Sequence, residues 1–470
     1  MKHDETGTKT DELSFSSLAL REELLKNLVT LGYDSMTPIQ LQSLPIILKG
    51  RDIIAQAKTG SGKTAAFGLS LLNRLDVENY AVQALVLCPT RELAEQVSQA
   101  LRQLARLLPN VKVLNLSGGM PMKPQLDSLR HSAHIVVGTP GRVQKHLDKQ
   151  SLSVKHLKTL VLDEADRMLD MGFYDAINDI INLCPEPRQT LLFSATYPAE
   201  IKKLAGKFMR DPQRVVIDDV HTELAIEQVF YEADHQAGKF SILKALLLHH
   251  QPSSTLIFCN TKDQTSKLAA MLNNEGFSAI ALNGDMEQNE RDDAIILFKN
   301  NSCSILVATD VAARGLDIKE LPAVINFELA FEHDVHIHRI GRTGRAGSKG
   351  LAVSLTTPAD AQRLCAIEET LKSPVTWGDI ATLNKNDNKI LAPEMVTLCI
   401  SAGRKDKIRP GDILGALTNE GGLAGDVIGK IDIAALHSFV AVHHKQADKA
   451  LHHLKNGKLK GRKVNVRIIN

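Results

Sequence analysis

The stretch Ala57–Thr64 reads AKTGSGKT, and it decides the fold of the first part of the chain. An apolar run, Asp52–Ala57, leads into it, and the helix-like segment AAFGLSLLNRL follows it directly. A glycine-rich turn between a strand and a helix presents backbone N–H groups at the positive end of the helix, where a triphosphate binds. We therefore predict a phosphate-binding loop inside an α/β fold with a parallel sheet.

Two side chains of this loop have the chemistry that nucleotide binding requires. Lys63 is predicted to reach the β- and γ-phosphates of ATP, and the hydroxyl of Thr64 is predicted to ligate Mg²⁺. The other predicted ATP contacts in the loop are Thr59, Gly60, Ser61 and Gly62. Ala57 stands where the general pattern begins with glycine. A plain glycine turn is the alternative, but it does not account for Gly-Lys-Thr at the start of a helix.

A pair of carboxylates follows a second apolar strand. Thr159–Leu162 runs straight into Asp163-Glu164-Ala165-Asp166. Asp163 at the strand's carboxyl end can contact Mg²⁺ through water, and Glu164 can orient and deprotonate the attacking water. Alone, this tetrapeptide would be an ordinary acidic start of a helix. Together with the phosphate loop it predicts an ATPase.

Apolar runs alternate with helix-like segments along most of the chain, which predicts two tandem parallel-sheet units with helices on both faces of each sheet. A shorter β-α-β-β-α-β order follows from Met395, and it predicts a small split ferredoxin-like α+β domain. The predicted parts are an N-terminal tail 1–14, a first unit 15–217, a second unit 226–383, a linker 384–393 and a C-terminal domain 394–470.

Composition narrows the class of protein. No apolar run approaches the roughly 20 residues of a membrane span, and the polar first ten residues do not resemble a signal peptide. The cysteines form no CxxC pair and no zinc-like cluster, so we interpret them as structural thiols of a reducing compartment and expect a cytoplasmic protein. They are Cys88, Cys184, Cys259, Cys303, Cys365 and Cys399.

Charge is uneven along the chain. Residues 394–470 hold 13 lysines and arginines against 7 acidic residues, a net +6, and since the whole chain carries +2 the first 393 residues carry −4. A basic tail on a faintly acidic body suggests that the tail meets a polyanion. A solvated lysine-rich surface explains the charge alone equally well.

The motifs of the two α/β units, taken in order, resemble those of the DEAD-box family of ATP-dependent RNA helicases, and the resemblance covers about residues 15–370. Besides the phosphate loop and Asp-Glu-Ala-Asp, Thr37-Pro38-Ile39-Gln40 resembles the family's Q motif, although Met36 replaces its usual proline. The resemblance implies two RecA-like domains and an adenine site formed by Gln40 with Phe15 and Tyr33.

Further motifs of the first unit resemble the family's RNA-backbone contacts. They are Pro89–Ala94, Gly118-Gly119 and Thr139–Arg142, and from them the resemblance implies RNA contacts by Arg91, Gly119, Thr139 and Arg142. Backbone N–H groups, hydroxyls and arginines at strand ends suit phosphate binding. Ser194-Ala195-Thr196 resembles the element that links hydrolysis to strand separation, which implies a coupling role for Ser194, Thr196 and Asp166.

In the second unit, Ala308–Asp317 (ATDVAARGLD) and His338–Arg345 (HRIGRTGR) resemble the family's fifth and sixth motifs. By this resemblance Arg342 and Arg345 are arginine fingers that neutralise charge on the γ-phosphate. Asp317 would hold the ribose, Thr309 would contact RNA, and His338 would help couple the two units. A flexible arginine- and glycine-rich loop is the alternative.

The family resemblance implies an RNA-dependent ATPase that separates short duplexes locally. A passive RNA clamp and a DNA helicase or other P-loop ATPase are the alternatives. Ser194-Ala195-Thr196 argues against the clamp, and the Gln40 region and Asp-Glu-Ala-Asp argue against the DNA enzyme.

The tail has the element order of an RNA recognition motif, but its central strands carry Phe439 as their one aromatic residue, so the usual base-stacking platform is largely missing. Its sequence resembles the C-terminal domain of one bacterial branch of the family, which implies binding to a hairpin of 23S ribosomal RNA and a role in large-subunit assembly. A generic basic RNA-binding fold is the alternative. The RNA-binding residues predicted in the tail are Arg404, Lys405, Lys407, Arg409, Lys460 and Arg462.

Overall fold

The computed structural model describes residues 13–57, 60–217, 226–313, 321–344, 350–371, 373–383 and 389–469. The chain divides into two compact units near residue 220. The predicted site residues Thr59, Asp317 and Arg345 lie outside the described residues, as does the first half of the predicted linker. None of the helices in the described ranges has both the length and the apolar character of a membrane span.

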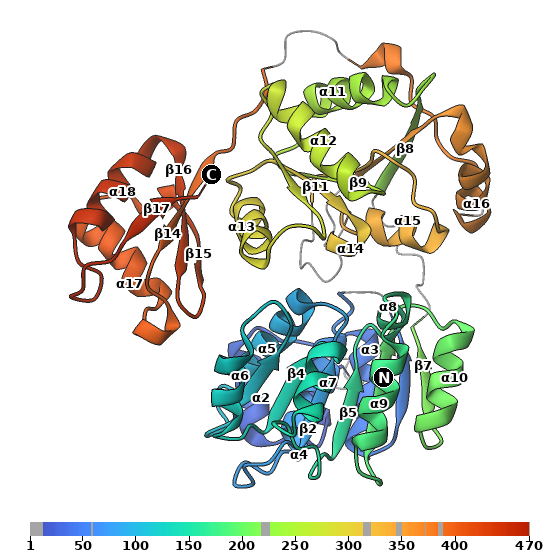
Figure 1. The fold of residues 1–470 in the computed structure, drawn as a ribbon, viewed down its shortest axis with the longest axis vertical. Helices are drawn as coiled ribbons and strands as arrows, with labels where there is room; N and C mark the ends of the chain where they lie inside the picture. The colour runs from blue at the N-terminus through green and yellow to red at the C-terminus, as the bar shows by residue number, and fades with distance from the viewer. Residues whose placement is uncertain are drawn as a thin grey trace, which may run out of the picture. The chain divides into compact units, whose positions relative to one another are not determined.

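The first unit is a parallel sheet of seven strands in the order β3-β4-β2-β5-β6-β1-β7 (Figure 1). Its strands are β1 Ile53–Gln56, β2 Ala84–Leu87, β3 Val113–Leu116, β4 Ile135–Gly138, β5 Thr159–Leu162, β6 Gln189–Ser194 and β7 Gln213–Val216. Its helices are α2 Glu22–Thr30, α3 Pro38–Leu48, α4 Lys63–Arg74, α5 Arg91–Leu104, α6 Met122–Leu129, α7 Pro140–Asp148, α8 Ala165–Asp170, α9 Tyr174–Leu183 and α10 Ala199–Phe208.

Helices cover both faces of this sheet because alternate strand residues point in opposite directions. On β1, Ile53 and Ala55 join the core under α2 to α5, whereas Ile54 joins the core under α7 to α10. The inner strands are buried on both faces and read as continuous apolar runs. The predicted parallel sheet is therefore confirmed, and the carboxyl ends of β1, β5 and β6 lie next to one another at one edge.

The second unit contains a parallel sheet of six described strands in the order β10-β11-β9-β12-β13-β8. Its strands are β8 Ile226–Glu232, β9 Thr255–Cys259, β10 Ala279–Leu282, β11 Ile305–Thr309, β12 Ala323–Asn326 and β13 Gly350–Thr356. Its described helices are α11 Gly238–His250, α12 Lys262–Asn274, α13 Gln288–Lys299, α14 Asp310–Ala313, α15 His333–Ile340 and α16 Ala361–Leu371. Leu243, Leu246 and Leu268 pack α11 and α12 onto one face of the sheet.

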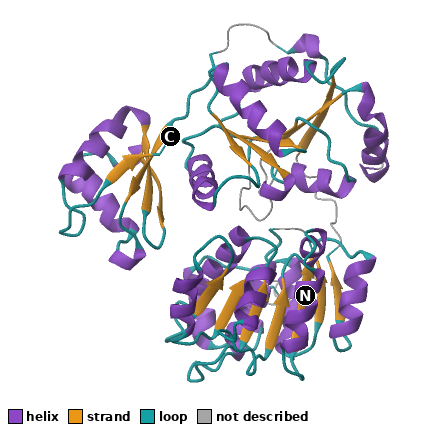
Figure 2. Cartoon of the chain, viewed as in Figure 1, coloured by secondary structure: helices purple, strands orange, loops and turns teal. Residues whose placement is uncertain are grey.

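The C-terminal domain has its own antiparallel sheet in the order β15-β16-β14-β17, with both helices on one face (Figure 2). Its elements are β14 Met395–Ile400, α17 Pro410–Gly415, β15 Ile428–Ile433, β16 Ser438–His443, α18 Ala447–Asn456 and β17 Val466–Ile468. Helix α17 continues directly as a π-helix, Ala416–Glu420, in which the Gly421 N–H donates to the Ala416 carbonyl. The predicted split ferredoxin-like order is confirmed.

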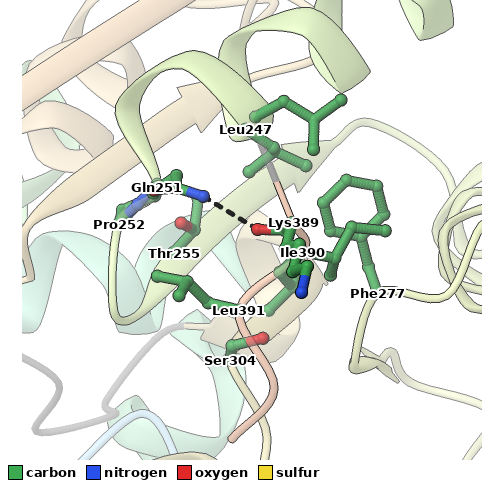
Figure 3. A pocket seen from close by; sticks show the side chains of 11 residues that line it. Leu247, Gln251, Pro252, Thr255, Phe277, Ser304, Lys389, Ile390 and Leu391 are labelled. Atoms are coloured by element: carbon green, nitrogen blue, oxygen red, sulfur yellow. Dashed lines mark hydrogen bonds between the residues drawn. The ribbon is translucent and has the colours of Figure 1, made fainter. Parts of the chain in front are cut away.

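The chain just before this domain lies against the second unit. The Gln251 side chain donates a hydrogen bond of 2.8 Å to the carbonyl of Lys389, as Figure 3 shows. Ile390 and Leu391 continue past Phe277 and Thr255 and line a small pocket there. The second half of the predicted linker is therefore fixed to the unit that it leaves.

The sheet of the C-terminal domain also contacts the second unit through the face that carries no helix. Cys399, Phe439 and Ile469 form an apolar cluster with Leu297 of α13 and with Cys303. Polar contacts border this cluster: Thr397 bonds Ser302 at 2.7 Å and Asn300 at 3.2 Å, and Arg467 lies 3.6 Å from Asp293. Phe439, the lone aromatic of the central strands, is 7% exposed because it is buried here.

Candidate active site

The phosphate loop lies between β1 and α4, as predicted. Gly60 and Gly62 have φ values of +89° and +95°, which side chains with a Cβ rarely adopt. A Cβ on Gly62 would also lie 2.5 Å from the amide nitrogen of Gln40. Lys63 is buried, and its ammonium group donates a 2.6 Å hydrogen bond to the carbonyl of Ala57. The lysine thus lies folded back across its own loop.

Gln40 links the start of α3 to the phosphate loop. Its side-chain oxygen accepts the N–H of Thr37 at 2.9 Å, and its amide donates to the Gly62 carbonyl at 3.1 Å. Phe15 is buried and meets the ring of Tyr33 edge-on at 6.2 Å. The structure brings these three predicted adenine contacts into the same unit, while their role in binding adenine stays a prediction.

Asp163 and Glu164 follow β5. They lie at the same edge of the sheet at which β1 ends and the phosphate loop begins. Asp163 is 3% exposed, and burial raises the pKa of its carboxyl to about 7 even though the Lys63 ammonium acts to lower it. Glu164 adopts the left-handed conformation with φ of +51°, and its carboxylate is buried 3.5 Å from Arg167. A glutamate in this conformation carries backbone strain, which proteins retain mainly at functional positions.

Asp166 connects this strand end to Ser194-Ala195-Thr196 at the end of β6. One carboxylate oxygen accepts the N–H of Ala195 at 3.1 Å and both the N–H and the hydroxyl of Thr196 at 2.9 and 3.0 Å. The Ser194 hydroxyl lies 3.3 Å from the Asp166 N–H. Burial opposes the charge on Asp166, but the hydrogen bonds from Thr196 outweigh it and hold the pKa below its usual range. The predicted coupling residues of the first unit therefore form one hydrogen-bonded group.

These donors suit a nucleoside triphosphate with a divalent cation. The Ser61 hydroxyl is buried, and it has no hydrogen-bond partner in the part of the chain that the structure describes. Such an orphaned group beside a loop of backbone N–H groups fits a phosphate oxygen. The Thr64 hydroxyl and the Asp163 carboxylate are the hard oxygen ligands that Mg²⁺ prefers.

The predicted RNA contacts of the first unit also converge. The side chain of Arg91 lies against Gly118, near enough that a Cβ there would be 3.3 Å from its guanidinium. Arg142 on α7 donates from both terminal nitrogens to the carbonyl of Met120, at 3.0 Å each. Burial lowers the pKa of Arg142, and the nearby positive charge of Arg91 lowers it further. Thr139 directly precedes α7.

The second unit holds an arginine that the sequence analysis did not single out. Arg339 on α15 is fully buried and makes a paired ion contact with Asp310, 2.7 Å at each of two nitrogens. It also donates to the Glu328 carbonyl at 2.6 Å and to the Asn260 side chain at 2.9 Å. Asp310 follows Thr309, so Arg339 joins the fifth motif to the sixth. Two parallel bonds to a carboxylate are strong and directional.

The other described site residues predicted in this unit lie close in sequence to Asp310 or to Arg339. Thr309 is buried at the end of β11, and its hydroxyl accepts the N–H of Ala312 at 3.4 Å. His338 lies on α15 and Arg342 just beyond it, where the guanidine-bearing side chain is 8% exposed. Arg345 and Asp317 fall outside the described residues, so their placement stays a prediction.

The six predicted basic residues of the tail lie at one end of the C-terminal domain, and all six are exposed. Lys460 donates to the carbonyl of Lys407 at 2.7 Å and pairs with Asp412, which in turn accepts the Arg409 N–H. The backbone of Arg404 bonds to the loop after β15, next to β16. We call this set the basic edge: Arg404, Lys405, Lys407, Arg409, Lys460 and Arg462.

Three family models match consecutive parts of the chain. A DEAD/DEAH box helicase model matches residues 37–204, a helicase conserved C-terminal domain model matches 238–347, and a DbpA RNA-binding domain model matches 397–468. The ATP-dependent RNA helicase DbpA of Escherichia coli is 52% identical over 463 residues, covering 97% of this chain and 99% of that protein. The chain belongs to the DEAD-box RNA helicase family.

Other DEAD-box helicases share the two α/β units. CshA of Bacillus cereus is 41% identical over 372 residues, which cover 79% of this chain and 71% of that protein. The solved structure of Saccharomyces cerevisiae Dbp5 bound to RNA and ADP–BeF3 is 32% identical, with a TM-score of 0.72 over 78% of this chain and 96% of that one. The predicted fold class and the predicted enzyme, a DEAD-box RNA helicase with ATPase activity, are confirmed.

The residues that the motif strings missed are those whose partners lie far away in sequence. Arg339 belongs to the quoted HRIGRTGR string, but its partner Asp310 is 29 positions earlier. Gln125 bonds to both Arg142 and His146, and neither Gln125 nor His146 belongs to a string that resembles a family motif. Arg339 and Gln125 each bond to a residue of a string that resembles a family motif.

Proposed function

We propose that this helicase is recruited to a hairpin of 23S ribosomal RNA by its C-terminal domain and separates short RNA duplexes during assembly of the large ribosomal subunit. The observation that carries the proposal is the basic edge, six exposed cations on one end of a domain that matches the DbpA RNA-binding model. The 52% identity to DbpA over nearly the whole chain supports it.

The basic edge has the features of an RNA-binding surface. Its cations come from two loops, 403–409 and 460–462, that hydrogen bonds hold together. Lysine and arginine contacts to phosphates provide affinity, and loops can read the unstacked bases of a hairpin. The open face of the sheet packs on the second unit through Phe439, which supports binding at the basic edge.

ATP hydrolysis is assigned to the residues at the ends of β1, β5 and β6. Lys63 and the loop 60–62 bind the phosphates, Thr64 and Asp163 would hold Mg²⁺, and Glu164 accepts a proton from the attacking water. The bound Mg²⁺ would supply charge neutralisation at the phosphates. Arg342 and Arg345 stabilise the charge that develops on the γ-phosphate.

Asp166 and Thr196 are assigned to the coupling of ATP hydrolysis to RNA strand separation. Three hydrogen bonds tie Asp166 to the end of β6, so a shift of the strand end at Glu164 moves Ser194-Ala195-Thr196 with it. Arg91, Gly119, Thr139 and Arg142 hold the RNA backbone in the first unit, and Thr309 does so in the second. Backbone contacts of this kind carry little sequence preference, which leaves target choice to the tail.

The proposal is tested by measuring steady-state ATP hydrolysis under three conditions. These are no RNA, a generic single-stranded RNA, and 23S ribosomal RNA. Strong stimulation by the ribosomal RNA alone is expected, and strand separation of a short duplex joined to the hairpin should accompany it. Equal stimulation by all RNAs would contradict the recruitment role. Hydrolysis without strand separation would favour a passive clamp.

Variants of the basic edge sharpen that test. The double variant Arg404→Ala/Lys405→Ala should raise the ribosomal RNA concentration needed for half-maximal hydrolysis. The slope of log binding constant against log salt concentration should become less steep by roughly 0.7 per lost phosphate contact. Lys455→Ala removes an exposed lysine of α18 outside the basic edge and serves as the control. An identical shift in both variants would point to general charge and not to a defined surface.

A further inference from the structure

Gln125 lies between the loop that carries Gly118 and Gly119 and the helix that carries Arg142. It is on α6, and its side chain is 8% exposed. Its amide donates a 3.0 Å hydrogen bond to the carbonyl of Ser117, which precedes the two glycines. Its side-chain oxygen accepts a 2.8 Å hydrogen bond from Arg142. One buried carboxamide therefore bonds to two of the proposed RNA-binding elements at once.

The chemistry of these partners fixes the orientation of the carboxamide. A guanidinium has donors and no acceptor, so the oxygen of Gln125 must face Arg142 and its amide must face the Ser117 carbonyl. His146, one helical turn beyond Arg142 on α7, places Nε2 3.0 Å from the same oxygen. Since that oxygen only accepts, the imidazole must carry its proton on Nε2.

His146 in turn is held in place. It is completely buried, and its Nδ1 lies 2.8 Å from the Ser151 hydroxyl. Burial, with a further contribution from the charge of Arg142, lowers the pKa of the imidazole and keeps it neutral. The neutral ring acts as a fixed donor that, together with the Ser117 carbonyl, allows Gln125 one side-chain orientation.

Arg142 needs such support because its surroundings oppose its charge. Both terminal nitrogens point to the Met120 carbonyl, and Arg91 repels it. Without Gln125 the guanidinium would lose an acceptor and would gain freedom to move away from Arg91. A mobile arginine must be ordered again whenever a phosphate binds, which costs side-chain entropy.

We infer that Gln125, supported by His146, is a positioning residue for RNA binding that holds Arg142 and the Gly118-Gly119 loop in the arrangement that receives the RNA backbone. Gln125 acts through Arg142 and does not itself touch RNA. The inference rests on the RNA-binding role proposed above for Arg142. It extends that role to two buried side chains outside the motif strings.

The test measures RNA-stimulated ATP hydrolysis by the full chain. Gln125→Met keeps the length of the side chain and removes its hydrogen bonds, and we expect the half-saturating RNA concentration to rise roughly tenfold. The maximal rate at saturating RNA and the KM for ATP should not change. Gln125→Glu keeps the acceptor for Arg142 but loses the donor to the Ser117 carbonyl, so it should recover only part of the loss. Gln103→Leu, an exposed glutamine of α5, is the control.

Comparison with Arg142→Gln separates the inference from the proposed function. If Arg142→Gln weakens RNA binding and Gln125→Met has no further effect in that background, Gln125 acts through Arg142 as inferred. If Arg142→Gln weakens binding and Gln125→Met alone does not, the inference is wrong and the RNA site stands. If neither change affects RNA, the RNA role of Arg142 is wrong as well. An additive loss in the double variant would show a general structural defect and would also overturn the inference.

Discussion

Asp163→Asn should stabilise the nucleotide-free protein above neutral pH, although it removes a proposed catalytic residue. Burial raises the pKa of Asp163 from 3.8 to about 7, so the folded state binds this proton more tightly than the unfolded state does. Stability is therefore lost as pH rises from the unfolded pKa through the folded one. The two pKa values differ by about three units, and each unit corresponds to about 1.4 kcal/mol. The charged Asp163 therefore lowers the unfolding free energy by at most about 4 kcal/mol above pH 8.

Asparagine has the same shape as aspartate but carries no charge. The variant therefore does not lose stability by burying a charged group. Urea unfolding in EDTA, followed by hydrogen exchange at the amides of β5, measures the gain in the first unit. We expect it to be roughly 1 kcal/mol larger at about pH 8.5 than at about pH 6. Asp34→Asn, at an exposed position, is the control. A gain that is absent, or that does not change with pH, would refute the reasoning.

Three further changes test other parts of the first unit. Glu164→Gln should slow hydrolysis by about 10²–10⁴-fold and trap the ATP-bound protein on RNA, and normal turnover would disprove the role of the glutamate. Thr196→Val removes one hydrogen bond to Asp166 and should reduce strand separation per ATP hydrolysed; an equal fall in both rates would count against coupling. Gly138→Ala should cost about 1–3 kcal/mol of unfolding free energy because its Cβ would collide with the carbonyl end of β3, whereas Gly206→Ala, with open space around it, should not destabilise.

The inner strands of both α/β units could be predicted from the sequence because burial on both faces makes them continuous apolar runs. The edge strands of the first sheet could not. Val113–Leu116 and Gln213–Val216 lie at the two edges of the first sheet, and each contains polar or half-exposed residues. Ile226–Glu232, at the edge of the second sheet, is predicted only as the start of the second unit. In the tail, β17 begins at Val466 because its pairing with β14 starts there.

The side chains predicted for the nucleotide site follow strand ends in fixed order, so the sequence could place them, and their binding of nucleotide stays a prediction. The hydrogen bonds of the site could not be predicted. The bond from Gln40 to Gly62 and the Asp310–Arg339 pair join residues 22 and 29 positions apart. Such distances are set by how helices pack on the sheet, and local spacing holds no information about them. The basic residues of the tail were predicted as a group, and folding brings them to one edge.

The contact between Phe439 and α13 bears on whether the tail can be exchanged between proteins. A tail excised at the linker would present Phe439, Ile469 and the thiol of Cys399 to water as an apolar patch. Grafted onto another helicase, it would need a matching surface there to cover that patch. Exchange of the tail between helicases would therefore work best when α13 is transferred together with the tail.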